Sequence, residues 1–236
     1  MSEKVAVLFT GGRDSTLVAC LEALQGNEVY LLTCDSGIGI KREISEFRVE
    51  ELRNRFPERI VGRTILPTYG LLRSIAIENI ESDFKRWGVN LILLGDKLAI
   101  HAAATVYCLE HGITRLVDGC VEYQQDLAEQ KHVAIDLFKE FEQQYGINYD
   151  CPIYHFGSQD SVKYALLSLG ISSKSLEGVS IFGDSFSEPS DEAVKTYMED
   201  KLGICKNYVE FMTKTSKVVS TYARKVPQSG EVVVSQ

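Results

Sequence analysis

The first 24 residues carry an apolar run, two glycines and then a helical pattern. Val5–Phe9 has no polar member, which is typical of a parallel strand buried on both faces. Gly11 and Gly12 come next, and Asp14-Ser15 are residues expected at a helix start. Apolar positions then recur at helical spacing, at Leu17, Val18, Leu21 and Leu24. The pattern predicts a strand, a tight turn and a helix in direct succession.

Beyond this stretch, apolar runs and helical patterns alternate with a period of roughly 25–30 residues, as in βαβ units. The expected strands are Glu28–Thr33, Arg59–Leu66, Val89–Leu94 and Ile113–Val117. The expected helices are Ile38–Phe56, Gly70–Trp87, Leu98–Leu109 and Leu127–Tyr145. Together with the first strand they predict an α/β fold: a doubly wound, Rossmann-like parallel sheet of about five strands.

The C-terminal part is expected to be mainly helical. After a short extended segment, the predicted elements are a helix from Gln159 to Leu169, a loop over Ser172–Pro189, and helices over Ser190–Leu202 and Cys205–Met212. We therefore expect one domain over residues 1–212. Residues 213–236 are polar, and their valines flank Pro227–Gly230, so they form either a hairpin on a sheet edge or a frayed tail.

Composition favours an ordinary globular protein. The chain has 236 residues, of which 44% are hydrophobic and 25% charged. No apolar run approaches the ~18–20 residues of a membrane span, and the first residues do not form a signal peptide. Six scattered cysteines without a C-x-x-C pair are typical of reduced thiols. We expect a cytoplasmic protein with no membrane partner.

The net charge of −8 argues against nonspecific binding to nucleic acid and favours a small-molecule substrate. Two further partners stay open: a protein amine as the acceptor, and a second copy of the chain in a homodimer.

The turn at Gly11 and Gly12 is a candidate phosphate site. A strand end, a glycine turn and a helix start bring several N–H groups to one point, with the helix dipole behind them. The spacing fits neither G-x-x-x-x-G-K-[ST] nor G-x-G-x-x-G, which excludes a P-loop and a dinucleotide fingerprint. The alternative is a tight turn that binds no ligand.

Two charged residues follow other predicted strands. Asp35 ends the second strand, where it is a candidate to face the ribose or adenine of a nucleotide; it is equally an ordinary turn aspartate. Lys97 follows Val89–Leu94, where its ammonium is a candidate to reach a phosphate from the same rim; the alternative is solvated surface.

Thr10-Gly-Gly-Arg-Asp-Ser15 resembles the SGG-x-DS signature of the PP-loop ATP pyrophosphatases, the adenine nucleotide alpha hydrolase-like superfamily of PP-loop/HUP fold. Thr10 replaces the usual serine and keeps its hydroxyl. The resemblance implies that ATP, with Mg²⁺, is split between its α and β phosphates. The residues that it implies for nucleotide binding are Phe9, Thr10, Gly11, Gly12, Arg13, Asp14, Ser15 and Thr16. Thr33 and Asp35, at the end of the second strand, are further nucleotide-binding candidates.

Within that superfamily the chain is most similar to the 7-cyano-7-deazaguanine synthases of queuosine biosynthesis. Leu31–Gly37 resembles their T-x-D-Y-G segment, and Asp118–Tyr123 resembles part of their G-x-N-x-x-D-Y loop. The resemblance implies C–N ligase chemistry on a deazapurine-like acceptor. The chain departs from the family where four cysteines bind zinc, since Cys205 stands alone there. A single thiolate does not complete a tetrahedral site, so zinc is not expected.

These observations lead to one main hypothesis, an ATP-dependent adenylating enzyme that forms AMP and pyrophosphate. Asp14, Ser15 and Lys97 are its candidate catalytic residues: Asp14 caps the loop or helps to hold Mg²⁺, Ser15 donates its hydroxyl to phosphate, and Lys97 neutralises the leaving pyrophosphate. Arg13 is a second candidate to neutralise the leaving pyrophosphate. Two alternatives stay open: a sulfur-transferring, tRNA-thiolating enzyme that uses Cys120 or Cys151, and a nucleotide-binding regulatory module without turnover.

Overall fold

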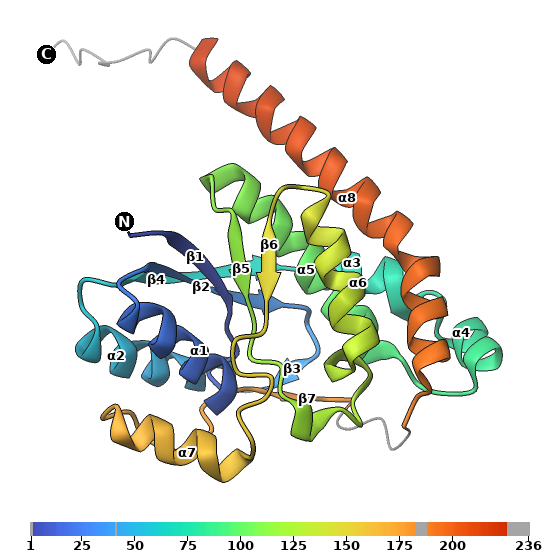
Figure 1. Ribbon diagram of the computed structural model, residues 1–236. Helices are drawn as coiled ribbons and strands as arrows, with labels where there is room; N and C mark the ends of the chain where they lie inside the picture. Colours follow the sequence, from blue (N-terminus) through green and yellow to red (C-terminus); the bar gives the residue numbers. More distant parts are fainter. Residues whose placement is uncertain (1, 41, 183–187, 226–236) are drawn as a thin grey trace, which may run out of the picture.

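Five parallel strands form the central sheet of the protein (Figure 1). The computed structural model describes residues 2–40, 42–182 and 188–225, except the side chains of Arg42 and of residues 216–225. The strand order is β4-β2-β1-β5-β6. Its members are β1 (Lys4–Leu8), β2 (Glu28–Asp35), β4 (Ile60–Pro67), β5 (Arg115–Val117) and β6 (Asn148–Asp150). A separate antiparallel ribbon pairs β3 (Gly39–Ile40) with β7 (Val179–Ser180).

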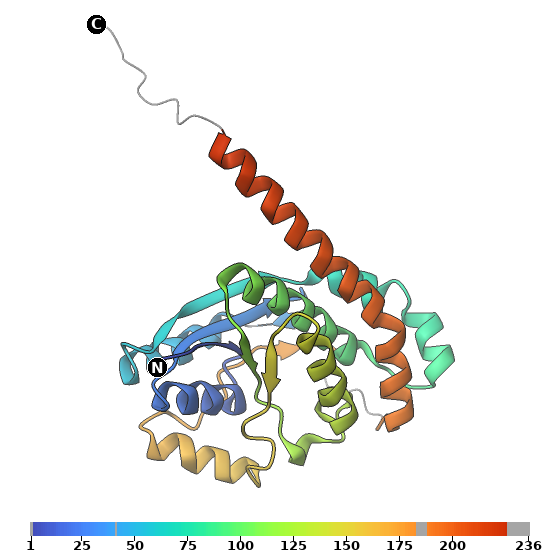
Figure 2. The ribbon, with the colours of Figure 1, turned by 45° about the horizontal axis from the view of Figure 1, so that its top comes forward.

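Helices cover both faces of the sheet, as Figures 1 and 2 show. One face carries α1 (Arg13–Leu24), α2 (Ser45–Arg55) and α7 (Gln159–Ser168). The other carries α5 (Ile92–His111), α6 (His132–Gln143) and α8 (Asp191–Lys225). The shorter elements are η1 (Arg42–Ile44), α3 (Tyr69–Leu72), the π-helical η2 (Arg73–Ile77), α4 (Ile80–Trp87), η3 (Glu122–Gln124) and η4 (Ala128–Gln130).

The central strand shows why its sequence is apolar throughout. Val5 and Val7 pack into the core on the α1 side, whereas Ala6 and Leu8 pack into the core on the α5 side. All four side chains are buried, since successive residues of a strand point to opposite faces and both faces are covered. The predicted α/β, doubly wound Rossmann-like sheet of about five strands is confirmed.

The strand order reverses beside β1. β2 and β4 lie on one side of β1, and β5 and β6 lie on the other. In open parallel sheets, ligands bind at the carboxyl ends of the strands where the order reverses. This point is flanked by Gly11, after β1, and by Asp118, after β5.

The predicted strand Val89–Leu94 is wrong, because α5 is a single helix that begins at Ile92. A short apolar run does not by itself distinguish a strand from a buried helix. Here the run continues into alanines and forms a core helix. Gly95 lies inside that helix, where a β-carbon would come within 2.7 Å of Ala76 Cβ and the Tyr197 hydroxyl. Its lack of a side chain therefore permits close packing.

Several other predicted helices differ in extent from the observed ones. The helix expected over Gly70–Trp87 is divided into α3, η2 and α4, and the one expected over Ile38–Phe56 starts only after β3 and η1. The two helices expected after residue 190 are one continuous helix, α8. Its C-terminal half extends away from the sheet (Figure 2). The helix passes through the expected boundary at residue 212, so residues 213–225 are helical and form neither a hairpin nor a frayed tail. Val232–Val234 and Pro227–Gly230 lie outside the described residues.

Helix α5 has the length and hydropathy of a membrane-spanning segment, with 20 residues and a hydropathy of 1.4 in its most apolar window. Two thirds of that window (67%) is buried inside the protein, against the sheet and α8. The same composition is expected of the core helix of a globular α/β domain.

Candidate functional site

Gly11 and Gly12 connect β1 to α1. Gly11 has a φ of 87°, a left-handed conformation, and a β-carbon there would lie 2.2 Å from the carbonyl oxygen of Leu176. Gly12 is the N-cap residue of α1. The first N–H groups of a helix have no partner within it, so the turn presents donors and the positive end of the helix dipole at the sheet edge. This arrangement is able to bind a phosphate group.

Three hydroxyl side chains shape the turn. The Thr10 N–H donates to Ser15 Oγ at 3.3 Å, and the Gly12 N–H donates to Thr10 Oγ1 at 3.1 Å. The Thr16 hydroxyl donates to the Gly12 carbonyl. Ser15 and Thr16 are buried, whereas Thr10 is exposed and its hydroxyl donates to the Glu177 carboxylate at 3.1 Å. Of these three hydroxyl groups, the exposed one of Thr10 therefore already binds an anionic group, the Glu177 carboxylate.

The charged residues of the turn face different neighbours. Asp14 accepts a hydrogen bond from the Tyr123 hydroxyl at 2.6 Å, so Tyr123, from η3, lies against the turn. Burial raises the pKa of Asp14, and the hydrogen bond from Tyr123 partly opposes this. Arg13 Nη1 is buried with no hydrogen-bond partner among the described residues. A buried cationic nitrogen without a partner, at the glycine turn, is suited to hold an anion.

Lys97 reaches the sheet edge from α5 rather than from a strand end. Its ammonium forms a buried ion pair with Asp118, the residue directly after β5. Burial alone would lower the pKa of Lys97, but the charge of Asp118 outweighs it and raises that pKa above its ordinary value. Burial alone would raise the pKa of Asp118, and the charge and hydrogen bond of Lys97 lower it instead. Both residues are charged at neutral pH.

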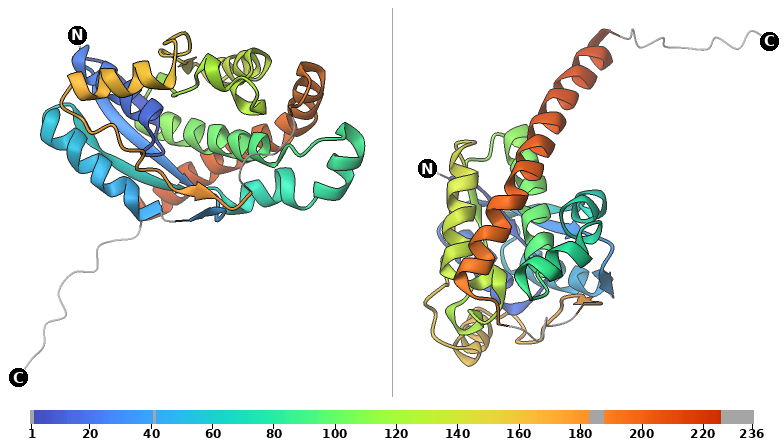
Figure 3. Two further views of the ribbon diagram at one scale, coloured as in Figure 1. Left: turned by 90° about the horizontal axis from the view of Figure 1, so that it is seen from below. Right: turned by 90° about the vertical axis from the view of Figure 1, so that its right-hand side faces the viewer.

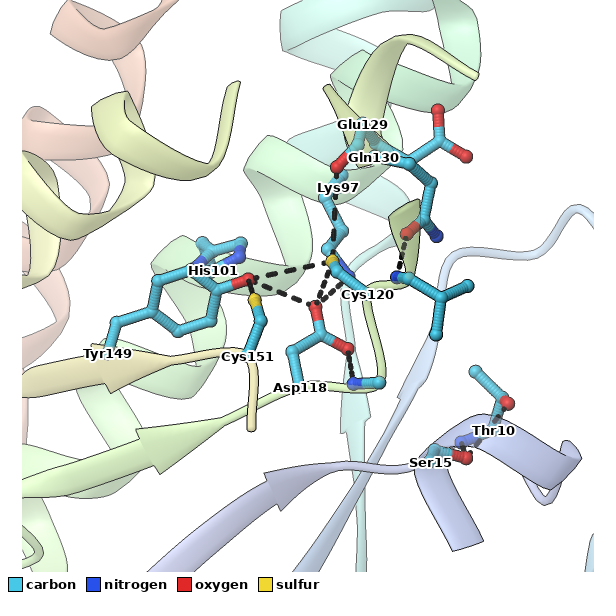
Figure 4. A network of polar contacts seen from close by, with 12 residues as sticks. Thr10, Ser15, Lys97, His101, Asp118, Cys120, Glu129, Gln130, Tyr149 and Cys151 are labelled. Atoms are coloured by element: carbon cyan, nitrogen blue, oxygen red, sulfur yellow. Dashed lines mark hydrogen bonds and ion pairs between the residues drawn. The ribbon is translucent and has the colours of Figure 1, made fainter. Parts of the chain in front are cut away.

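Two thiols, of Cys120 and Cys151, lie beside this ion pair (Figure 4). The hydroxyl of Tyr149 donates to Asp118 at 3.2 Å and contacts the sulfur atoms of Cys151 at 3.3 Å and of Cys120 at 3.8 Å. The contact with Cys151, together with burial, raises the pKa of Cys120 well above its ordinary value. The thiolate is the nucleophilic form of cysteine, so these surroundings disfavour the nucleophilic form of Cys120.

A cavity of about 180 Å³ opens between the ends of β1 and β2. Its lining includes Phe9, Thr10, Thr33, Lys97 and Asp118. Phe9, Thr10, Thr33 and Lys97 were predicted from sequence as site residues. The first two follow β1, whereas Thr33 lies in β2 and Lys97 in α5. Thr33 also donates its hydroxyl to the Phe9 carbonyl at 2.8 Å, which ties the two strand ends together. The cavity adjoins the glycine turn through Thr10.

Asp35 lies apart from this cavity. Its carboxylate accepts the Gly37 N–H at 3.0 Å, as in an ordinary Asx turn. Together with Glu43 and Arg63, Asp35 lines a neighbouring depression instead. A nucleotide contact by Asp35 remains a prediction.

Asp96 was not predicted from the sequence as a site residue. Burial raises the pKa of this carboxyl group to about 6, and a hydrogen bond with Ser36, which lines the cavity, partly opposes the shift. One carboxylate oxygen, Oδ1, is buried without a partner among the described residues. A carboxyl group with a pKa near neutrality beside a cavity is a candidate general base. The only signal in the sequence is a charged residue within an apolar run.

Metal-binding side chains are not gathered in the described part of the chain, where no group of three or more His, Cys, Asp or Glu residues is placed to hold an ion. Cys205 is buried, and its sulfur faces the Leu98 carbonyl at 3.8 Å.

No protein-family model and no curated protein matches the sequence. Among solved structures, the fold is similar to that of a 4-thiouridine synthetase in a complex with RNA and bound ATP, with a TM-score of 0.52 and 15% identity over 88% of this chain and 53% of that chain. A predicted subunit of tRNA methyltransferase from Methanocaldococcus jannaschii has a TM-score of 0.45 and 17% identity over 72% of this chain and 90% of that one. The similarity to the synthetase supports the Rossmann-like α/β fold of this chain.

Proposed function

We propose that this protein binds ATP at the carboxyl end of β1 and transfers its adenylyl group to an acceptor, releasing pyrophosphate. The observation that carries the proposal is the position of the glycine turn. It lies at the point where the strand order reverses, at the start of α1 and next to a cavity lined by Lys97. This arrangement offers a phosphate site and a nucleoside site side by side.

The residues have separate roles in this reaction. The N–H groups at the start of α1 and the Thr10 hydroxyl bind the β and γ phosphates, while the cavity takes the nucleoside. An acceptor oxygen attacks the α-phosphorus, the bond from the α-phosphorus to the bridging oxygen breaks, and pyrophosphate leaves with the electron pair. Arg13 and Lys97 stabilise the charge that develops on it. Asp14 would hold Mg²⁺, which, when bound, neutralises phosphate charge.

For the acceptor we propose a small planar carboxylate or amide of the deazapurine type, as the sequence resemblance implies. The net charge of −8 supports a small molecule over a polynucleotide. Attack of a nucleophile such as ammonia on the activated carbon would then release AMP and form a C–N bond.

Product analysis with ATP labelled at the α or γ phosphate tests this proposal. The protein is incubated with Mg²⁺ and 7-carboxy-7-deazaguanine, other carboxylates or bulk tRNA. The expected products are AMP and pyrophosphate, in an acceptor-dependent manner. Lys97→Met combined with Asp118→Asn, which leaves no uncompensated buried charge, should lower the rate. Formation of ADP and phosphate would contradict adenylation. ATP binding without turnover would favour the regulatory alternative.

A second candidate function, sulfur transfer to an adenylated acceptor, is favoured by one observation. Cys120 and Cys151 both contact Tyr149 next to the Lys97–Asp118 pair. In that reaction a cysteine would carry the sulfur that displaces AMP. Cys120→Ser and Cys151→Ser should then abolish incorporation of sulfur from a persulfide donor while ATP cleavage continues. Full activity of both variants with a nitrogen nucleophile would favour the first candidate.

A further inference from the structure

Residues 172–181, called the strap below, follow α7, include β7 and cross the carboxyl edge of the sheet (Figure 3). One end is held by Arg48, a fully buried side chain whose Nη1 donates to the Ser172 carbonyl at 2.8 Å and whose Nη2 donates to the Lys174 carbonyl. The other end is held by the pairing of β7 with β3 and by the Ile181 N–H, which donates to the Ile38 carbonyl at 2.9 Å. The strap is thus fixed at both ends and lies over the site between them.

The centre of the strap contacts the glycine turn. The Leu176 N–H donates to the Gly11 carbonyl at 3.2 Å, and the Glu177 carboxylate accepts from the Thr10 hydroxyl. Glu177 Oε2 lies so close to the turn that a β-carbon on Gly12 would be 2.4 Å from it. Ser175 donates to the other carboxylate oxygen at 2.6 Å. The carboxylate is therefore oriented by a second hydroxyl of the strap and directed at the turn.

We propose that Glu177 occupies the phosphate site of this protein and that ATP and pyrophosphate bind only when the strap moves it away. This inference rests on the proposed function, because it concerns the same turn. Carboxylate and phosphate oxygens are both stabilised by N–H groups at a helix start. They exclude one another here, since the space at Gly12 does not admit even a β-carbon beside Glu177.

The size of the cavity supports a closed state. Ligand sites usually have volumes of about 300–1,000 Å³, whereas this cavity has about 180 Å³ and Gly178, Val179 and Ser180 of the strap form part of its wall. In the closed state this cavity has room for part of a nucleoside. Glu177 lies where the phosphates of a bound nucleotide would extend. The carboxylate also lies near that of Asp14, whose pKa it helps to raise, so the two negative charges repel in the closed state. That repulsion favours release of the strap.

The test measures binding of inorganic pyrophosphate and of ATP with Mg²⁺, by calorimetry, to the full chain and two variants. Glu177→Gln removes the competing charge, and it should bind pyrophosphate roughly 3–10-fold more tightly than the unaltered protein, as expected when an anion at a helix start is lost. Glu81→Gln is the matched control. It removes the same charge from an exposed residue of α4 that pairs with Lys85 at 2.5 Å, and its affinity should be unchanged.

Hydrogen exchange gives a second readout. The Leu176 N–H, which is bonded to the Gly11 carbonyl in the closed state, should exchange faster when pyrophosphate is bound. Equal affinity of all three proteins, or a Leu176 amide that stays protected with pyrophosphate bound, would overturn the inference and leave the proposed function intact. If none of the three binds pyrophosphate or ATP, the proposed function is wrong and the inference fails with it.

Discussion

Lys97 and Asp118 form a buried ion pair that joins the second turn of α5 to the residue directly after β5. Each side chain is largely shielded from water, with exposed fractions of 13% and 8%. Both line the same cavity as Thr10 and Thr33. The pair therefore fixes the position of a positive charge next to the proposed phosphate site.

Removal of Lys97 should destabilise the protein strongly. Lys97→Met leaves the Asp118 carboxylate buried without its partner, which should lower the free energy of unfolding by about 3–5 kcal/mol. Unfolding in urea measures this. Lys97→Met combined with Asp118→Asn should recover much of the loss, because no uncompensated charge remains. Lys85→Met is the control, since its ion pair is exposed and should contribute less than about 1 kcal/mol. Equal losses at Lys97 and Lys85 would contradict the burial argument.

Asp96 should make stability depend on pH. Its folded-state pKa of about 6 lies above the ordinary value of 3.8, so the folded protein binds more protons than the unfolded chain between these values. Stability contributed by this group therefore falls as pH rises from about 4 to 6. Asp96→Asn should be more stable than the unaltered protein at pH 7.5, by up to about 3 kcal/mol, and similar to it near pH 3.5.

Thermal unfolding at the two pH values checks the effect of Asp96→Asn. Asp136→Asn, at an exposed position of α6, serves as the control and should change stability little at either pH. An Asp96 variant that is less stable at pH 7.5 would mean that the ionised carboxylate is stabilised by a contact other than the one with Ser36.

Alanine substitutions at Gly12 and Gly119 should differ in their effect on stability. The β-carbon added by Gly12→Ala would contact only the end of the flexible Glu177 side chain. The variant should therefore fold, while its affinity for ATP falls. Gly119→Ala would place a β-carbon 2.6 Å from the Ser15 nitrogen and 2.8 Å from the Asp14 carbonyl carbon. Because backbone would have to move, the loss of stability should be about 1–3 kcal/mol.

Urea unfolding and ATP calorimetry separate these two effects. Gly203→Ala, in α8 with nothing within 4 Å of its β-carbon, is the control and should raise stability by about 0.5–1 kcal/mol. Unchanged ATP affinity of Gly12→Ala and of the larger Gly12→Val would argue against phosphate binding at this turn.

We also expect the purified protein to hold no stoichiometric zinc. Cys205 is the one cysteine of the chain after residue 151, and a single thiolate does not complete a tetrahedral zinc site. Elemental analysis checks this, and about one zinc per chain would contradict it.

The sequence by itself determined the segment from β1 to α1. An apolar strand, a glycine in a left-handed conformation and a helix start are each specified by neighbouring residues, so their pattern predicts both the turn and its capacity for a phosphate. The alternation of such segments likewise predicted the parallel sheet, although one of the predicted strands was a helix.

Only the tertiary structure decided what surrounds that turn. The run from Val89 is compatible with a strand or a helix, and packing between the sheet and α8 selects the helix, which brings Lys97 to Asp118. Glu177 is 167 positions from Thr10 along the chain, yet it contacts the Thr10 hydroxyl. Such contacts depend on how distant segments fold over one edge of the sheet, and residue spacing does not encode that placement.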